Sequence, residues 1–425
     1  MRDIFRNMTN LVLNEMERED MFILIGPRQI GKTTMLQNLE RTLKNRGEKT
    51  LFFNLDFESD RKFFDSQDIL LSKIELEIGK RKAYIFADEI QRKENAGLFL
   101  KGIYDKKFPY KWILSGSGSL ELKEKIKESL AGRKRMYELN PVHFLEFFHY
   151  KTDYKYLSRE DEAFLIEAEK RDLLFREYLS FGGFPRVILD ETVSEKRRTI
   201  EEIYTSYIDK DIRDLGITKT REFGEMYRIL SSRAGQILNY NELSNSLNLS
   251  LQTVKQYLWY AEKTFQIDLC FPYFQNRKKE ITKSPIVYFR DIGFMNYSSG
   301  NFHTDLKSTD LGFIFQNFIF QHLREKIRYE NSTLNYWRTT DGAEVDIILR
   351  TPKEIIPIEV KYRTFKKPEI TRSLRNFIEK YKPPTVWIVN LNYTDIMKLG
   401  ETLVHFIPWH RMIRLEFSNL RNGTV

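Results

Sequence analysis

Cysteine, histidine and long apolar runs are scarce in this 425-residue chain, and each scarcity excludes a class of protein. The single cysteine, Cys270, excludes a disulfide scaffold and a cysteine-rich zinc site. The six histidines lack the close spacing of metal ligands. No apolar run approaches the roughly 18 residues of a membrane-spanning helix, and the charged N-terminus is untypical of a signal peptide. We therefore expect a cytoplasmic protein that does not contact a membrane.

The basic excess of the chain is concentrated at one end. Lysine and arginine number 69 against 60 acidic residues, a net charge of +9. Residues 351–425 hold 13 basic and 7 acidic residues and so contribute +6 of it. Such a region favours a polyanionic partner, with nucleic acid as the first candidate. A solvated basic surface without a partner is the alternative.

The hydrophobic pattern changes twice along the chain. Apolar runs at residues 22–25, 51–55, 84–87 and 112–114 alternate with helical, charged stretches. This order predicts an α/β domain with a parallel sheet covered by helices on both faces. A mostly helical region follows Pro141. From about residue 222, short helices precede two strand-like runs with a basic segment between them, which predicts a winged helix. From about residue 302 a helix precedes strands at 345–349 and 355–360.

A glycine-rich loop follows the first strand and precedes a helical stretch. It matches G-x-x-x-x-G-K-[ST] through Gly26, Pro27, Arg28, Gln29, Ile30, Gly31, Lys32 and Thr33. Glycines allow backbone N–H groups to surround phosphates at a helix N-terminus. We expect Lys32 to bridge the β- and γ-phosphates and the Thr33 hydroxyl to hold Mg²⁺. Together with Thr34, the loop predicts a site for ATP and Mg²⁺.

Two acidic residues and a serine-rich segment end the later strands. Asp88 is predicted to orient the Mg²⁺ shell and Glu89 to polarise the attacking water. The next strand ends in Ser-Gly-Ser, where Ser115 or Ser117 is predicted to sense the γ-phosphate or align the water. A simple Gly/Ser turn is the alternative for these serines.

These motifs resemble those of AAA-type ATPases, abundant in archaea and bacteria, that join an AAA core to a C-terminal domain of unknown function. The resemblance extends over nearly the whole chain and includes the loop and the segments 86–91, 115–117, 129–133 and 178–185. It implies that Arg133 is a trans-acting or sensor arginine that completes the γ-phosphate site. A structural salt bridge is the alternative for Arg133.

Four charged residues near the C-terminus are similar to the Asp…Glu-x-Lys pattern of restriction-endonuclease-like folds. Strand periodicity places Glu344 with Asp346, and Glu359 with Lys361, on one face of neighbouring strands. This predicts Mg²⁺ held by Asp346 and Glu359, with Lys361 steering a water for nuclease chemistry. The solvated face of a hairpin is the alternative. Gln316 stands where the family usually has a glutamate, and a neutral amide is a poorer Mg²⁺ ligand.

The winged helix predicts contacts with nucleic acid, and a protein-binding winged helix is the alternative. The predicted contact residues are Gln252, Lys255 and Gln256 on a helix and Arg277, Lys278 and Lys279 on the wing.

The pattern and the resemblance together divide the chain into four parts. The predicted parts are an ATPase core at 1–140, a helical lid at 141–221, a winged helix at 222–300 and an endonuclease-like domain at 301–425. The predicted function is an ATP-hydrolysing switch or motor that acts on nucleic acid, with nuclease activity left open. The alternative is a nucleotide-dependent scaffold or sensor that binds a protein partner. Assembly into a homo-oligomer, common among AAA-type ATPases, is left open.

Overall fold

The computed structural model describes residues 3–117, 129–274, 283–306 and 308–415. The chain forms two compact units whose segments alternate along the sequence. Unit 1 consists of Met1–Tyr150, Gly183–Thr220 and Trp259–Gln266, and unit 2 of Lys151–Gly182, Arg221–Leu258 and Ile267–Val425. This interleaved division into two units differs from the four consecutive domains expected from the sequence, which stay a prediction. None of the described helices is long and apolar enough to cross a membrane.

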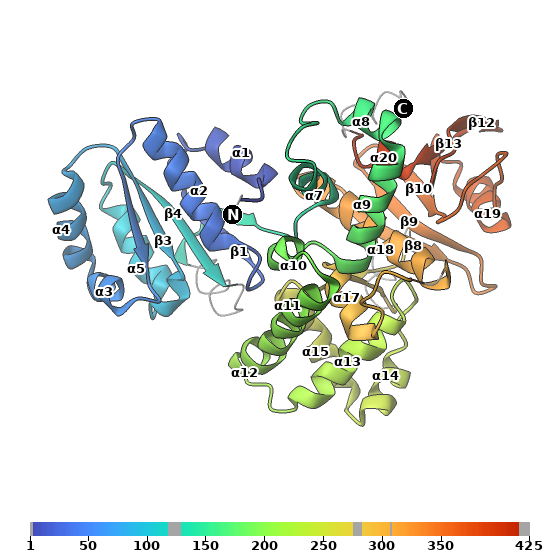
Figure 1. The fold of residues 1–425 in the computed structure, drawn as a ribbon. Helices are drawn as coiled ribbons and strands as arrows, with labels where there is room; N and C mark the ends of the chain where they lie inside the picture. Colours follow the sequence, from blue (N-terminus) through green and yellow to red (C-terminus); the bar gives the residue numbers. More distant parts are fainter. Residues whose placement is uncertain (1–2, 118–128, 275–282, 307, 416–425) are drawn as a thin grey trace. The chain divides into compact units, whose positions relative to one another are not determined.

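A five-stranded parallel sheet is the centre of unit 1 (Figure 1). Its strands, in the spatial order β2-β3-β4-β1-β5, are β1 Met21–Gly26, β2 Thr50–Asn54, β3 Ala83–Asp88, β4 Tyr110–Ser117 and β5 Lys134–Glu138. The four strands expected from the apolar runs are confirmed. The pattern missed β5, because this edge strand reads Lys-Arg-Met-Tyr-Glu and is mostly half-buried.

Helices cover this sheet, whose inner strands β1, β3 and β4 are largely buried. Every residue of β1 and β3 is buried, as expected for a sheet covered on both faces. One face packs against Leu70 and Ile74 of α4 and against Leu100 and Ile103 of α5. The helical elements are α1 Asn7–Asn14, α2 Lys32–Asn45, α3 Glu58–Arg61, η1 Lys62–Phe64, α4 Gln67–Ile78, η2 Ile90–Arg92, α5 Ala96–Asp105, α7 Phe144–Lys151, α10 Pro185–Leu189, α11 Val193–Ser206, η3 Tyr207–Asp211 and α12 Ile212–Asp214.

Unit 2 contains a mixed six-stranded sheet in the order β12-β13-β11-β10-β9-β8. Its strands are β8 Thr333–Arg338, β9 Glu344–Arg350, β10 Ile355–Val360, β11 Thr385–Asn390, β12 Asp395–Leu399 and β13 Thr402–Pro408. The helices α8 Glu160–Ile166, α9 Ala168–Phe181, α17 Ile292–Ser299, α18 Ser308–Lys326, α19 Arg372–Tyr381 and α20 Trp409–Met412 accompany it. Aromatic packing joins distant segments: Trp409 stacks on Phe175 of α9 with ring centroids 3.6 Å apart.

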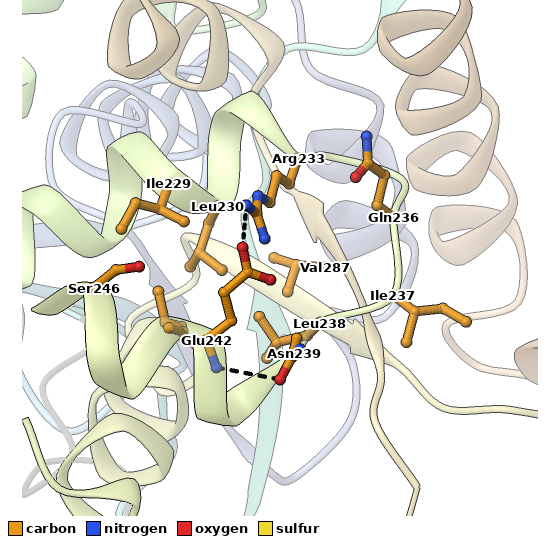
Figure 2. A pocket seen from close by; sticks show the side chains of 11 residues that line it. Ile229, Leu230, Arg233, Gln236, Ile237, Leu238, Asn239, Glu242, Ser246 and Val287 are labelled. Carbon is orange, nitrogen blue, oxygen red and sulfur yellow. Dashed lines mark hydrogen bonds and ion pairs between the residues drawn. The ribbon is translucent and has the colours of Figure 1, made fainter.

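Three helices and an antiparallel hairpin occupy the part of the chain where a winged helix is expected. They are α13 Thr220–Ser232, α14 Tyr240–Leu247, α15 Leu251–Lys263, β6 Ile267–Cys270 and β7 Ile286–Phe289. Figure 2 shows how the start of α14 is fixed: Asn239 accepts the backbone N–H of Glu242, whose carboxylate pairs with Arg233. An N-cap of this kind stabilises a helix by about 1 kcal/mol.

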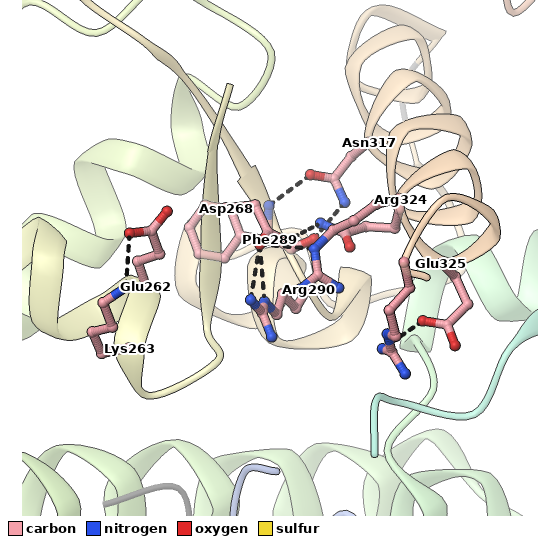
Figure 3. Close-up of polar contacts among 10 residues, drawn as sticks. Glu262, Lys263, Asp268, Phe289, Arg290, Asn317, Arg324 and Glu325 are labelled. Carbon is pink, nitrogen blue, oxygen red and sulfur yellow. Dashed lines mark hydrogen bonds and ion pairs between the residues drawn. The ribbon is translucent and has the colours of Figure 1, made fainter. Parts of the chain in front are cut away.

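A charged cluster joins the hairpin to α18 (Figure 3). Asp268 of β6 accepts 2.9 Å contacts from Arg290 and from Arg324. Its second carboxylate oxygen accepts the Gln321 amide at 3.1 Å. The side chains of Asp268 and Arg290 are only 13% and 8% exposed, so neither charge has much access to water.

We expect the Asp268→Ala substitution to lower the free energy of unfolding by about 2–4 kcal/mol, because it leaves two nearly buried guanidinium groups without this carboxylate. Urea denaturation followed by circular dichroism measures the loss. Glu262→Ala is the matched control, since the Glu262 side chain is 30% exposed and its contact with Lys263 is long, at 3.9 Å. The effect of Glu262→Ala on the free energy of unfolding is expected to stay within about 0.5 kcal/mol. Equal stability of the Asp268→Ala and Glu262→Ala variants would contradict this account.

Candidate functional site

The loop between β1 and α2 has a conformation that its glycines make possible. Gly31 is the N-cap of α2 with φ 93°, in the left-handed region that favours glycine. A Cβ on Gly26 would lie 2.5 Å from the carbonyl oxygen of Leu139, so a larger residue does not fit there. The first turn of α2 contains no acidic residue. The partial positive charge of this helix N-terminus is therefore open to an anion.

Lys32 lies inside this loop. Its side chain is buried, and its Nζ donates to the carbonyl oxygens of Gly26 at 3.1 Å and Pro27 at 2.8 Å. Burial lowers the pKa of Lys32, whereas the carboxylates of Glu89 and Asp88 raise it. The ammonium group is thus positioned by the loop backbone and faces the acidic end of β3.

Three oxygen-bearing side chains meet beside Lys32. The Thr33 hydroxyl donates to Asp88 Oδ2 at 2.6 Å, and the Ser115 hydroxyl donates to Asp88 Oδ1. Asp88 is 1% exposed and Ser115 is fully buried. The oxygens of Thr33 and Asp88 form the hard donor set that Mg²⁺ prefers, so these residues fit the metal. The structure thus places Ser115 against Asp88.

Glu89 follows in a strained conformation. Its φ of 57° and ψ of 43° place a non-glycine residue in the left-handed region, and backbone strain of this kind clusters at active sites and switch regions. The Gln91 amide donates to the Glu89 carboxylate, and the backbone N–H of Glu89 lies 3.4 Å from Ser115 Oγ. Gln91 was not among the predicted site residues, although it belongs to the segment 86–91 that carries the resemblance.

A buried ion pair supports the loop from behind. Arg6 and Glu146 are joined by a 3.0 Å contact. Arg6 also donates to the carbonyl oxygens of Ile30 at 3.3 Å and Asn140 at 2.5 Å. Sequence reasoning missed this pair, because a single arginine before α1 carries no motif. Ile30 itself is fully buried, so its side chain serves packing.

The remaining loop residues contact the helical segment after residue 183 or face outward. Arg28 Nε lies 2.6 Å from Asp211 Oδ1, and Arg186 donates to Gln29 Oε1 at 2.8 Å. Thr34, in the first turn of α2, is exposed.

Arg133 lies away from this site. It precedes β5, and Lys134 pairs with Met21 at the start of β1, whereas the loop follows the end of β1. Its Nε contacts Asp105 Oδ1 at 3.0 Å. Arg133 therefore lies near the start of the parallel strands, whereas the phosphate loop lies at their carboxyl ends. A trans-acting role for Arg133 stays a prediction. The Ser117 side chain is outside the described residues.

The C-terminal acids lie on adjacent strands, but protein groups hold them. β9 and β10 are antiparallel, with Ile347 opposite Ile358. Asp346 Oδ2 accepts the Val360 N–H at 2.7 Å. Burial raises the pKa of Asp346 to about 7, although Lys361 acts to lower it.

The neighbouring carboxylates have partners too. Glu359 contacts Lys361 at 2.8 Å and the Thr371 hydroxyl at 3.0 Å, and Glu344 contacts Arg338 at 3.3 Å. Gln316 donates to the Tyr288 hydroxyl at 2.9 Å. Over the described part of the chain, no group of three or more His, Cys, Asp or Glu residues is placed to hold a metal. Mg²⁺ binding by Asp346 and Glu359 stays a prediction.

The predicted nucleic-acid contacts on α15 are accessible. Gln252, Lys255 and Gln256 are exposed, and Lys255 Nζ lies 5.5 Å from the centre of the Tyr240 ring. The other three predicted contacts, Arg277, Lys278 and Lys279, lie outside the described residues.

Three sequence families match this chain, and the first match contains the phosphate loop. A sequence family described as "AAA domain" matches residues 18–148. Two families described as domains of unknown function, DUF8612 and DUF4143, match residues 172–305 and 311–412. The AAA match indicates ATP binding and hydrolysis by the first of these regions.

Similar full-length proteins come from archaea and bacteria and are uncharacterized. Protein MJ1544 of Methanocaldococcus jannaschii is 27% identical over 88% of this chain and 82% of its own length. An uncharacterized Haemophilus influenzae protein is 24% identical over 91% of this chain and 93% of its own length.

Two solved structures are similar at a low level. AMPPCP-bound DnaA from Aquifex aeolicus has a TM-score of 0.27 and 18% identity, covering 60% of this chain and 86% of that chain. Cdc6p from Pyrobaculum aerophilum has a TM-score of 0.31 and 12% identity, covering 69% and 90%. At TM-scores below 0.5, neither similarity bears on the function. The chain is therefore similar, in order, to an AAA-type P-loop ATPase domain and to two domains of unknown function.

Proposed function

We propose that this protein is a Mg²⁺-dependent ATPase that couples hydrolysis to work on a nucleic-acid partner. The observation that carries the ATPase part is the 2.6 Å hydrogen bond between Thr33 and Asp88 beside the buried Lys32. It brings a loop hydroxyl and a strand carboxylate, 55 positions apart in the sequence, to one point at the N-terminus of α2.

Each residue has a distinct role in the proposed mechanism. Lys32 binds the β- and γ-phosphates, and Thr33 and Asp88 hold the metal. The bound Mg²⁺ supplies neutralisation of charge on the transferred phosphoryl group. Glu89 accepts a proton from the attacking water and orients it. The Gln91 amide and the Ser115 hydroxyl fix the positions of Glu89 and Asp88 respectively.

Two observations support nucleic acid as the partner. Residues 351–425 carry +6 of the +9 net charge, and the exposed face of α15 presents Gln252, Lys255 and Gln256. Amide and ammonium groups on a helix are suited to base edges and phosphates. A protein partner is the second candidate, because the same order of helices and hairpin also occurs in protein-binding winged helices.

Steady-state ATP hydrolysis at low salt tests the coupling. Rates with Mg²⁺ are measured alone and with duplex DNA, single-stranded DNA or RNA, with the Lys32→Ala variant as the blank. We expect one polymer to stimulate hydrolysis several-fold and the stimulation to decline steeply as salt rises, because phosphate contacts release counterions. A rate that no polymer changes at any salt concentration would contradict the nucleic-acid partner and favour the protein partner.

We do not extend the proposal to nuclease activity. Asp346 accepts a backbone N–H, Glu359 is held by Lys361 and Thr371, and Gln316 is neutral. A bound metal would have to displace these contacts. The C-terminal sheet is better suited to binding than to cleavage.

A further inference from the structure

The helical segment after residue 183 holds two side chains of the phosphate loop. Asp211 Oδ1 lies 2.6 Å from Arg28 Nε. Next to it, Arg186 donates to Gln29 Oε1 at 2.8 Å and to Glu202 Oε2 at 3.0 Å. These contacts lie within unit 1. The loop is therefore connected to α10 and α11 and to the turn after α11, although no motif marks these contacts.

Asp211 occupies an unusual backbone. It is the last residue of η3, a five-residue π-helical turn between α11 and α12. Such turns are rare and frequently occur at functional sites. The other end of η3 is anchored, because the Tyr207 hydroxyl lies 2.8 Å from Thr264 Oγ1 in a buried contact. The turn thus has one fixed end and one end that meets the loop.

The carboxylate of Asp211 also interacts electrostatically with Lys32, the lysine proposed to bind phosphate. Burial lowers the pKa of Lys32, and the carboxylates of Glu89, Asp88 and then Asp211 raise it, whereas Arg28 lowers it. Glu89 and Asp88 have roles in hydrolysis and metal binding, but Asp211 has neither. A triphosphate at Lys32 brings several negative charges to a place that this third carboxylate already influences, and like charges repel at short range.

We propose that the Asp211–Arg28 ion pair is a latch on the phosphate loop that a bound nucleoside triphosphate opens. The triphosphate repels Asp211 and competes with it for the Arg28 guanidinium. Opening the latch releases the Asp211 end of η3, so that α11 and α12 respond to the nucleotide state. A diphosphate carries less charge and opens the latch less. This inference rests on the proposed nucleotide site at Lys32.

Nucleotide affinity of the Asp211→Asn variant tests the latch. Asparagine has almost the same shape as aspartate but no charge, so the substitution removes the ion pair with Arg28. We expect AMPPNP with Mg²⁺, measured by isothermal titration calorimetry, to bind about tenfold more tightly to this variant than to the unaltered protein, equivalent to about 1.4 kcal/mol. The gain for ADP is expected to be smaller.

Asp209→Asn is the matched control. Asp209 lies in the same turn, and its replacement by asparagine removes the same charge. Its side chain, however, is 50% exposed, and its contact is with Arg213 at 3.9 Å. Its affinity for AMPPNP is expected to stay within twofold. Unchanged or weaker AMPPNP binding by Asp211→Asn would overturn the latch. Failure of the unaltered protein to bind AMPPNP would instead overturn the nucleotide site itself.

Hydrogen exchange on the unaltered protein gives a second test that does not depend on a variant. With saturating AMPPNP and Mg²⁺, amides of residues 207–214 are expected to exchange faster, while amides of the loop become protected. Slower or unchanged exchange in residues 207–214, together with a protected loop, would overturn the latch even if Asp211→Asn does not fold.

Discussion

The Lys32→Ala variant is expected to lose steady-state ATP turnover by at least about 1,000-fold, because it removes the charge that stabilises the transferring phosphoryl group. Nucleotide binding is also expected to weaken, since Lys32 contacts both outer phosphates in the proposed mechanism. A coupled assay for released phosphate, with Mg²⁺ and saturating ATP, measures the loss.

The fold is expected to survive this change. Lys32 is buried, and its Nζ donates only to loop carbonyls in the contacts described above. Removing it relieves the cost of burying a charge while leaving two acceptors that water can reach once the side chain is gone. Lys44→Ala is the matched control on the same helix, because the Lys44 side chain is 57% exposed and pairs with Glu40 outside the site. Turnover by Lys32→Ala equal to that of Lys44→Ala would refute the assignment of the site.

The Glu89→Gln variant is expected to bind ATP but to hydrolyse it about 100- to 10,000-fold more slowly, which is the usual contribution of a general base. Glutamine keeps the size of the side chain and its strained backbone, and it removes only the ability to accept a proton. Single-turnover hydrolysis measures the chemical step, and calorimetry with ATP measures binding.

Glu94→Gln provides the comparison for Glu89→Gln. Glu94 follows the same strand and is exposed, so its replacement is expected to leave both steps within twofold. The Glu89→Gln variant also separates binding from hydrolysis, because trapped ATP keeps the loop occupied. If Glu89→Gln hydrolyses ATP at the normal rate, the base is another group and the mechanism given above is wrong.

Local patterns predicted the parts of the site that lie close together in the sequence. The loop from Gly26 to Thr33 is continuous, and its strand and helix follow from short-range hydrophobic periodicity. Asp88 was found because it ends an apolar strand, and the parallel order of β1 and β3 brings it to the loop. In these cases the chemistry of one segment restricts its structure.

The contacts that sequence reasoning missed are long-range. Arg6 contacts Glu146 across 140 positions of the sequence. Arg28, in the loop after the first strand, contacts Asp211, which follows all five strands of the sheet in the sequence. Neither side chain lies in a periodic pattern, because an ion pair between two loops or helix ends imposes no repeat on either segment. The strand β5 was missed for a related reason: its half-buried edge position tolerates charged residues.

The same distance effect explains the exchange of segments between the two units. A linear division assumes that each domain is complete before the next begins. Here the last piece of unit 1, Trp259–Gln266, follows two stretches of unit 2. Phe265 in that piece is 3% exposed and belongs to the core of the five-stranded sheet. A pattern of short helices gives no sign that the end of α15 and the residues after it belong to unit 1, whereas the start of α15 belongs to unit 2.

Synthesis on the ribosome meets this arrangement in a fixed order. The strands of unit 1 emerge first, but Phe265 follows Tyr150 by 115 residues, which takes roughly 6–23 s at 5–20 residues per second. During that interval the sheet's apolar core lacks the aromatic ring that completes it. A translational pause between residues 150 and 266 therefore prolongs the life of a nascent chain with uncovered apolar surface, and chaperones and proteases recognise such chains.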